Sequence, residues 1–283
     1  MRLSAPLALA LGLAALARPA HTQSGQTPPW TGEFAVFSGN VLLGGIAAGV
    51  AQKARGGSFS DGFTRGAGAG AGIYAGKRIA AARWTGAGLV GRQVASVGSS
   101  VVYNAGQGRP SFEQIALPLG PVRFYVRPRG GGPRVHARVD AVALATLTYA
   151  ATRPELEWDE GRTLSSGGAV FRAPRHTFSG NGESAHGLSL SGAVLLGAVL
   201  PTGDDDGLFA HERVHTLQTD QLFLAIGRPL QDWVSGRSTA ARKISRWMDV
   251  DFAVPLLELI TLGVEEHDHR PWELESYQLS GVR

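Results

Sequence analysis

The chain has 283 residues, of which 43% are hydrophobic and 18% charged, and this composition indicates a globular protein and excludes a disordered one. The formal net charge is only +4 and no long basic run occurs, so we expect no nucleic-acid partner. Cysteine is absent, which excludes disulfides, a cysteine nucleophile and a lipid anchor on cysteine.

The N-terminus has the pattern of a secretory signal peptide over residues 1–22. Arg2 supplies the positive charge, residues 7–17 form a short apolar run, and Ala15-Leu16-Ala17 fits an A-x-A cleavage site. An uncleaved anchor helix is the alternative. An exported chain without disulfides fits bacterial export, so we expect a periplasmic, outer-envelope or extracellular protein.

Residues 23–37 are polar and contain proline, which predicts a flexible linker, and residues 38–106 are rich in glycine and alanine. This second region contains three helical candidates, 40–54, 61–83 and 84–103. Small residues three or four apart let helix backbones approach closely. Basic residues break up the apolar runs, which favours packed helices in a soluble or peripheral domain; membrane contact and a flexible low-complexity segment are the alternatives. The interrupting residues are Lys53, Arg55, Arg65, Lys77, Arg78, Arg83 and Arg92.

Residues 107–203 read as strands. Val122 to Arg127 alternate like a half-buried strand, apolar residues return from Val135 to Tyr149, and a last run covers residues 188–200. Short apolar runs separated by Pro, Gly, Ser and Asn predict an antiparallel sheet. The sequence therefore predicts an α+β fold: a Gly-rich helical region, then an antiparallel sheet joined to an active-site helix and C-terminal helices in one unit, 107–283.

The active-site helix is predicted over residues 204–226, which contain His211-Glu212-Arg213-Val214-His215, an H-E-x-x-H motif. Asp204 to Asp206 supply an N-cap, and Gly227 is expected to end the helix. Residues four apart lie on one helix face, so both imidazoles can reach one zinc ion. Glu212 can then accept a proton from a water on the metal. A surface helix with a chance motif is the alternative.

A catalytic zinc site usually has a third protein ligand. Pro271 is well placed to begin a helix, and Glu273 in its first turn is the best downstream candidate. Glu275 as the ligand is one alternative, and Glu273 as an ordinary first-turn helix acid is the other. The nearby His267 and His269 could bind a metal, but a solvated H-x-H loop is the simpler interpretation.

The two motifs together resemble those of the gluzincin metallopeptidases. In many of these enzymes a second helix begins N/R-P-x-E-x-E-A, and this chain has Arg270 to Ser276, RPWELES. The resemblance implies a zinc peptidase whose third metal ligand is Glu273. His215 to Gln218 is similar to an H-x-x-Q continuation found in bacterial members. Ser276 departs from the pattern, because alanine is usual there.

Several residues near the motifs are secondary candidates. Tyr277 is a candidate to stabilise an oxyanion, and Asp249 and Asp251 are candidates to orient a ligand histidine. Residues 252–264 are strongly apolar and short, which predicts a buried helix.

The leading hypothesis is an exported zinc metallopeptidase that acts on a peptide or protein substrate. Zinc is held by His211, His215 and Glu273, and Glu212 is the general base. The strand at 188–196 is expected to pair with an extended substrate by edge addition. The alternative is a non-catalytic envelope or membrane-associated interaction protein with a structural or degenerate metal site. The possible secondary site residues are Tyr277, Glu275 and Gln218.

Overall fold

A computed structural model describes residues 29–128, 132, 134–173, 178–180, 183–197, 204–251 and 270–281. The predicted signal peptide (1–22), the apolar segment 252–264, and His267 and His269 lie outside these residues.

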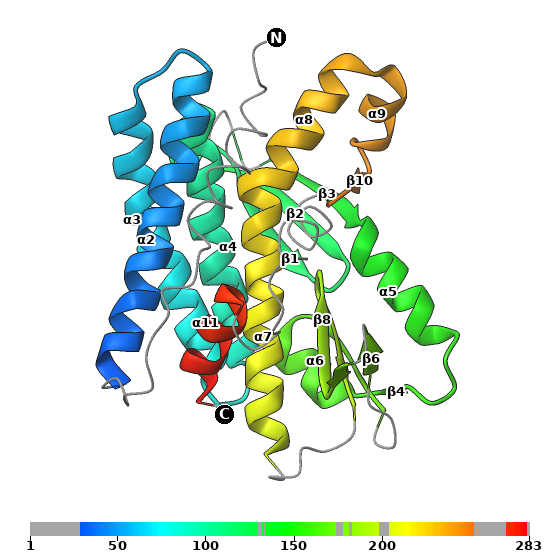
Figure 1. Ribbon diagram of the computed structural model, residues 1–283. Helices are drawn as coiled ribbons and strands as arrows, with labels where there is room; N and C mark the ends of the chain where they lie inside the picture. The colour runs from blue at the N-terminus through cyan, green and yellow to red at the C-terminus, as the bar shows by residue number, and fades with distance from the viewer. Residues whose placement is uncertain are drawn as a thin grey trace.

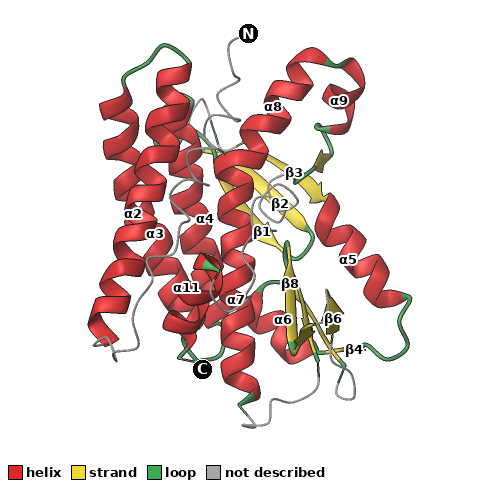
Figure 2. Cartoon of the chain, viewed as in Figure 1, coloured by secondary structure: helices red, strands yellow, loops and turns green. Residues whose placement is uncertain are grey.

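The described chain has an α+β fold in which a layer of long helices stands beside small sheets (Figures 1 and 2). This confirms the predicted fold class. The helices are α2 (Pro29–Ala54), α3 (Phe59–Ala81), α4 (Ala87–Gly106), α5 (Ala141–Ala151), α6 (Glu160–Ser166), α7 (Asp205–Leu222), the π-helical η1 (Phe223–Gly227), α8 (Arg228–Arg237), α9 (Thr239–Ile244) and α11 (Pro271–Ser280). The strands are β1 (Ile115–Leu119), β2 (Val122–Arg127), β3 (Arg134–Asp140), β4 (Glu157–Trp158), β5 (Ala169–Arg172), β6 (Phe178–Gly180), β7 (Glu183–Ala185), β8 (Gly187–Leu190), β9 (Ala193–Leu196) and β10 (Met248–Asp249).

The Gly/Ala-rich region forms the three long helices α2, α3 and α4, which pack against one another as the sequence predicts. The expected linker is wrong in its second part, because α2 already begins at Pro29. Proline suits the first turn of a helix, where its missing N–H has no partner to lose. Residues 29–37 therefore extend the first helix.

Close helix packing explains several of the glycines in this region. A Cβ added to Gly44 of α2 would lie 2.5 Å from the carbonyl oxygen of Gly66 and 3.1 Å from the Cα of Gly70, both on α3. A Cβ added to Gly91 of α4 would lie 2.5 Å from the carbonyl oxygen of Gly76 and close to the backbone of α3. Backbone atoms cannot move aside cheaply, so these positions require glycine.

We predict opposite effects for two glycine-to-alanine substitutions in this layer. Gly91→Ala should lower the free energy of unfolding by about 1–3 kcal/mol, because the new methyl group overpacks the α3–α4 contact. Gly72→Ala should raise it by up to about 1 kcal/mol, because no atom lies within 4 Å of the added Cβ and alanine is the better helix former. Urea unfolding followed by circular dichroism measures both. Equal effects of the two substitutions would contradict the packing argument.

The prediction of an antiparallel sheet is only partly right, because most neighbouring strands are antiparallel but both four-stranded sheets also contain a parallel pair. One four-stranded sheet has the order β1-β2-β3-β10, with β10 parallel to β3, and the other has the order β4-β5-β9-β8, with β5 parallel to β9. A short ribbon of β6 and β7 accompanies them. Parallel neighbours need a long connection, and strand alternation alone cannot reveal which strands are joined that way.

The expected strand from Val135 to Tyr149 is likewise only partly right. Strand β3 ends at Asp140, whose carboxylate accepts hydrogen bonds from the backbone N–H groups of Val142 and Ala143 at 3.0 Å. An aspartate that accepts these bonds is a strong N-cap, so the chain continues as helix α5.

Helix α7 lies between the helical layer and the second sheet, with α3 and α4 on one side and β8 and β9 on the other. Asp204 caps it as predicted, accepting a hydrogen bond from the Gly207 N–H at 2.9 Å. Gly227 does not end it: its φ of −61° is helical, and the chain runs through η1 into α8. The π-helical turn precedes Pro229, where a regular backbone ladder would lack a donor.

Buried ion pairs join α7 to the helical layer and the first sheet. Arg123 of β2 donates to Asp220 of α7 at 3.0 Å, to Asp140 at 3.1 Å and to Asp249 at 3.0 Å, and Arg92 of α4 donates to Asp220 at 2.7 Å. The sequence suggests Asp249 as a partner that orients a ligand histidine, but Asp249 belongs to this cluster, and its pairing with Arg123 ties β10 to the sheet. Asp251 is buried, and its role stays a prediction.

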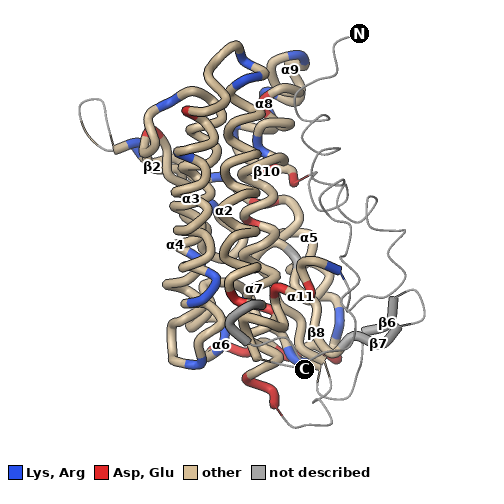
Figure 3. Tube along the Cα trace, turned by 60° about the vertical axis from the view of Figure 1, so that its left-hand side comes forward, with Lys and Arg blue, Asp and Glu red and all other residues tan. Residues whose placement is uncertain are grey.

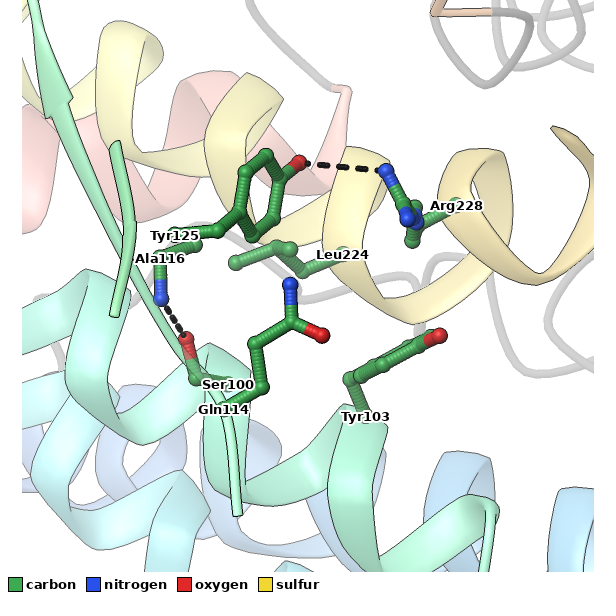
Figure 4. Close-up of a pocket in the computed structure, with 7 residues that line it drawn as sticks. All are labelled: Ser100, Tyr103, Gln114, Ala116, Tyr125, Leu224 and Arg228. Atoms are coloured by element: carbon green, nitrogen blue, oxygen red, sulfur yellow. Dashed lines mark hydrogen bonds between the residues drawn. The ribbon is translucent and has the colours of Figure 1, made fainter. Parts of the chain in front are cut away.

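A small cavity adjoins this cluster. Tyr125 and Arg228 form one side of it and Tyr103 and Gln114 the other, and the phenol oxygen of Tyr125 points to the Arg228 guanidinium, which donates to it at 3.5 Å (Figure 4). Its volume is about 10 Å³, which is room for about one water. The cavity is therefore part of the core packing and not a substrate pocket.

Candidate metal centre

Two helices bring three ligand atoms together at the middle of α7. His215 Nε2 lies 2.9 Å from His211 Nε2, and Glu273 Oε2 lies 3.1 Å from each of these nitrogens. The three side chains are only 6%, 14% and 5% exposed for His211, His215 and Glu273 respectively. These are the three residues that the sequence predicts as metal ligands, and they form one compact triangle.

The triangle fits the requirements of a zinc ion. Zinc bound at about 2.0–2.1 Å to three ligands at tetrahedral angles holds the ligand atoms about 3.3 Å apart, close to the distances found here. Two imidazoles and one carboxylate are also a donor set that catalytic zinc sites use. Within the described residues, this is the group of His, Asp and Glu side chains whose ligand atoms all lie within 4.8 Å of one another.

The local sequence explains why Glu273 reaches the histidines. Pro271 lies in the first turn of α11, as predicted, and Gly281 ends this helix with a left-handed φ of 71°. Helix α11 packs against α7, and Figure 3 shows acidic positions of the two helices in the same part of the molecule. The carboxylate of Glu273 is buried, which an ordinary first-turn acid does not require.

Glu275 is directed away from the triangle. Its carboxylate accepts hydrogen bonds from Lys77 Nζ at 2.8 and 2.9 Å and from Asn40 Nδ2 at 2.6 Å. Burial raises the pKa of Glu275, but the charge of Lys77 and the hydrogen bonds to it lower this pKa by more, so the group stays ionised. Of the two candidates for a third ligand, the structure brings Glu273 to the histidines and pairs Glu275 with a lysine.

The other two secondary candidates, Gln218 and Tyr277, lie beside the triangle. Gln218 Oε1 is 2.7 Å from His215 Nδ1, and the hydroxyl of Ser276 is 3.3 Å from the same nitrogen. Ser276 is fully buried, so the departure from alanine adds a polar contact with a histidine. The Tyr277 ring lies 4.6 Å from the His211 ring, centroid to centroid. Tyr277 is thus next to a candidate ligand, and its role at an oxyanion stays a prediction.

Glu212 is buried next to the triangle with its pKa shifted toward neutral. Burial raises the pKa of its carboxyl to about 7; the charge of His215 opposes the shift and that of Glu273 adds to it. A Cβ added to Gly187, the first residue of β8, would lie 2.6 Å from Glu212 Cδ. The carboxyl group therefore lies directly against the start of a strand that is at the edge of its sheet within the described residues.

Three residues of this centre were not singled out in the sequence. Lys77 and Asn40 come from the Gly/Ala-rich helices, where Lys77 was interpreted only as an interruption of an apolar run. Gly187 contacts Glu212 across the sheet–helix interface. The one available signal was a lysine directly after Ala75 and Gly76 in a helix rich in small residues, because a buried lysine needs a partner.

Comparisons of the chain with protein-family models, with curated proteins and with solved structures found no match.

We predict that the metal-free protein loses stability as the pH rises from 6 to 9. Burial lowers the pKa of His215, but its hydrogen bond to Glu273 and the charges of Glu212 and Glu273 more than offset this and raise it to about 9. A histidine with a raised pKa stabilises the fold fully below its unfolded value of 6.5, and this contribution disappears through about pH 9. The raised pKa of Glu212 also makes the fold less stable as the pH rises, in this case between about pH 4.5 and pH 7.

The measurement is the melting temperature in a chelator at pH 6, 7.5 and 9. Zinc requires neutral imidazole, so zinc-loaded protein should lose less stability over this range. The control is His215→Gln, in which the loss of melting temperature above pH 6.5 should be smaller than in the parent. An unchanged loss in this variant would show that other groups cause it.

We predict that Glu273→Gln weakens zinc binding by about 100-fold or more. Zinc sites of four ligands bind with about 10–16 kcal/mol, so one ligand accounts for about 3 kcal/mol, which is about 100-fold. Glu160→Gln is the matched control, since Glu160 is an exposed first-turn acid of α6. Dialysis against a competing chelator and metal analysis would measure both. If both variants kept the parent's affinity, Glu273 would be only a helix acid.

Proposed function

We propose that this protein is a zinc-dependent metallopeptidase that hydrolyses peptide bonds in a peptide or protein substrate. The observation that supports this most is the compact triangle of His211, His215 and Glu273, which lies next to a buried carboxyl group on the same helix turn. The resemblance to gluzincins supports it at the level of motifs.

Each residue of the centre has a role in this proposal. His211, His215 and Glu273 would hold the zinc ion, which, when bound, polarises the scissile carbonyl and makes a water more acidic. Glu212 accepts a proton from the attacking water and then donates it to the leaving nitrogen. Its raised pKa suits both steps, because a group that titrates near pH 7 can accept and release a proton. Tyr277, whose ring lies 4.6 Å from the His211 ring, is the candidate to stabilise the developing oxyanion.

The edge strand β8 supports a peptide as the substrate class. Strand β8 pairs with β9 on one side and is the last strand of its sheet within the described residues. Ser189 of β8 and Thr216 of α7 share a hydrogen bond of 2.6 Å, which holds the strand against the motif helix. An extended peptide that adds to this edge would pass Glu212, because Gly187 lies in contact with that carboxyl group.

The decisive variant is Glu212→Gln. The amide has almost the same shape as the acid but cannot accept the proton from water, so hydrolysis should fall by about 10²–10⁴-fold. Zinc content should remain at one equivalent, because Glu212 is not a ligand in the triangle. Turnover of a mixed peptide library, read by mass spectrometry beside metal analysis, measures both quantities. Cleavage by the variant at the parent's rate would contradict the role of Glu212.

A second candidate function is that of a non-catalytic protein of the bacterial envelope with a structural metal site. Residues Gly32–Ala54 form a helix long and apolar enough to cross a membrane, and one third of its most apolar window is buried. Phe34 and Leu42 of this helix are 67% and 51% exposed. Zinc binding without turnover, together with co-flotation of the protein with lipid vesicles, would favour this candidate. In both proposals the protein is exported, and cell fractionation would test this.

A further inference from the structure

Lys77 is a buried lysine in the middle of the Gly/Ala-rich layer. It lies on α3, is 2% exposed, and follows a stretch of glycine and alanine. Its ammonium group donates to both oxygens of Glu275 on α11 and to Asn40 Oδ1 on α2 at 2.9 Å. Burying a lysine is costly unless it is paired, so this contact joins three helices at one point.

The contact continues toward the candidate metal centre through Gln218 of α7. Glu275 Oε2, which accepts from Lys77, also accepts a hydrogen bond from Gln218 Nε2 at 2.8 Å. The same nitrogen donates to the backbone carbonyl of Trp272 at 2.9 Å. At the other end of this amide, Gln218 Oε1 lies 2.7 Å from His215 Nδ1. A chain of hydrogen bonds therefore leads from Lys77 to His215.

The donor and acceptor roles along this chain allow one arrangement. A backbone carbonyl only accepts, so the Gln218 atom beside Trp272 must be the NH₂ group, and Oε1 must face His215. An amide oxygen also only accepts, so Nδ1 of His215 must carry a proton. In neutral His215 the lone pair is then on Nε2, the nitrogen that lies 2.9–3.1 Å from the other two ligand atoms.

We propose that Lys77 is a positioning residue of the metal centre: it holds the Glu275 carboxylate, which together with the Trp272 carbonyl orients the Gln218 amide and so sets the tautomer and the ring orientation of His215. The inference rests on the proposed function, since it concerns the same metal site. It assigns the Gly/Ala-rich helices a part in the chemistry, because α3 contributes the lysine and α2 contributes Asn40. Partners that orient a ligand histidine typically change metal affinity by about 10–100-fold.

A purely structural salt bridge is the competing explanation, and a double-mutant cycle separates the two. The variants are Lys77→Met, Gln218→Leu and the double variant. If Lys77 acts through Gln218, each single variant binds zinc about 10–100-fold more weakly, and the double variant binds no more weakly than Gln218→Leu alone. Zinc affinity is measured by chelator competition well below the melting temperature of each variant. The visible spectrum of bound Co²⁺ should change in the same variants.

Arg92→Met is the matched control. It also removes a buried cation of the Gly/Ala-rich layer that is paired with a carboxylate on α7, Asp220. The hydrogen bonds of this pair lead to the Gly167 carbonyl and to β2, and not to a ligand histidine within the described residues. It should therefore lower stability while zinc affinity and the Co²⁺ spectrum stay at the parent's values. If Lys77→Met does not fold, Asn40→Ala replaces it, because Asn40 holds both Lys77 and Glu275.

The outcomes distinguish this inference from the function on which it rests. Parent protein that binds no zinc overturns the proposed function and the inference together. Parent protein that binds zinc, with Lys77→Met or Asn40→Ala at the parent's affinity and spectrum, overturns the inference alone. Losses that add up in the double variant also overturn it, because they would mean that Lys77 and Gln218 act independently.

Discussion

The structure depends on one constraint, which is that α7 is buried while carrying polar side chains. Six polar or charged residues of this helix are buried, and each needs a partner from a neighbouring element. Arg92 and Arg123 supply cations for Asp220, Ser189 supplies a hydroxyl for Thr216, and α11 supplies carboxylates to the histidine side. The buried polar residues are His211, Glu212, Arg213, Thr216, Gln218 and Asp220.

This constraint explains what the Gly/Ala-rich layer contributes, which is cations for the buried carboxylates. Lysine and arginine have long side chains, and they can reach carboxylates on α7 and α11 only if the layer that carries them lies close to these two helices. Glycine at the contacts of α2, α3 and α4 brings the backbones together, and then Lys77 reaches Glu275 and Arg92 reaches Asp220. The same Gly/Ala-rich composition therefore allows the helices to pack closely and allows their buried cations to pair with buried carboxylates.

The sequence predicted those features that depend on neighbours along the chain. The four-residue spacing of His211 and His215, the Asp204 cap and the start of α11 at Pro271 are local, and all three were found as expected. The parallel pairs of strands and the partner of Lys77 join residues far apart in the chain, for which a single sequence carries no signal. Gly227 shows a local signal that was overruled, since the helix continues through a π-helical turn into α8.

The electrostatics of the centre favour positive charge beside its buried carboxylates. Glu212 and Glu273 are buried close together, and two carboxylates at such a place repel each other, which contributes to the raised pKa of Glu212. In the absence of a metal, a proton on His215, held by a pKa of about 9, supplies positive charge at that point. A divalent cation held by His211, His215 and Glu273 would supply twice that charge in place of the proton. On the other side of His215, Lys77 neutralises Glu275, so that carboxylate does not compete for the cation, and the negative charge available to a metal is concentrated on Glu273 and Glu212.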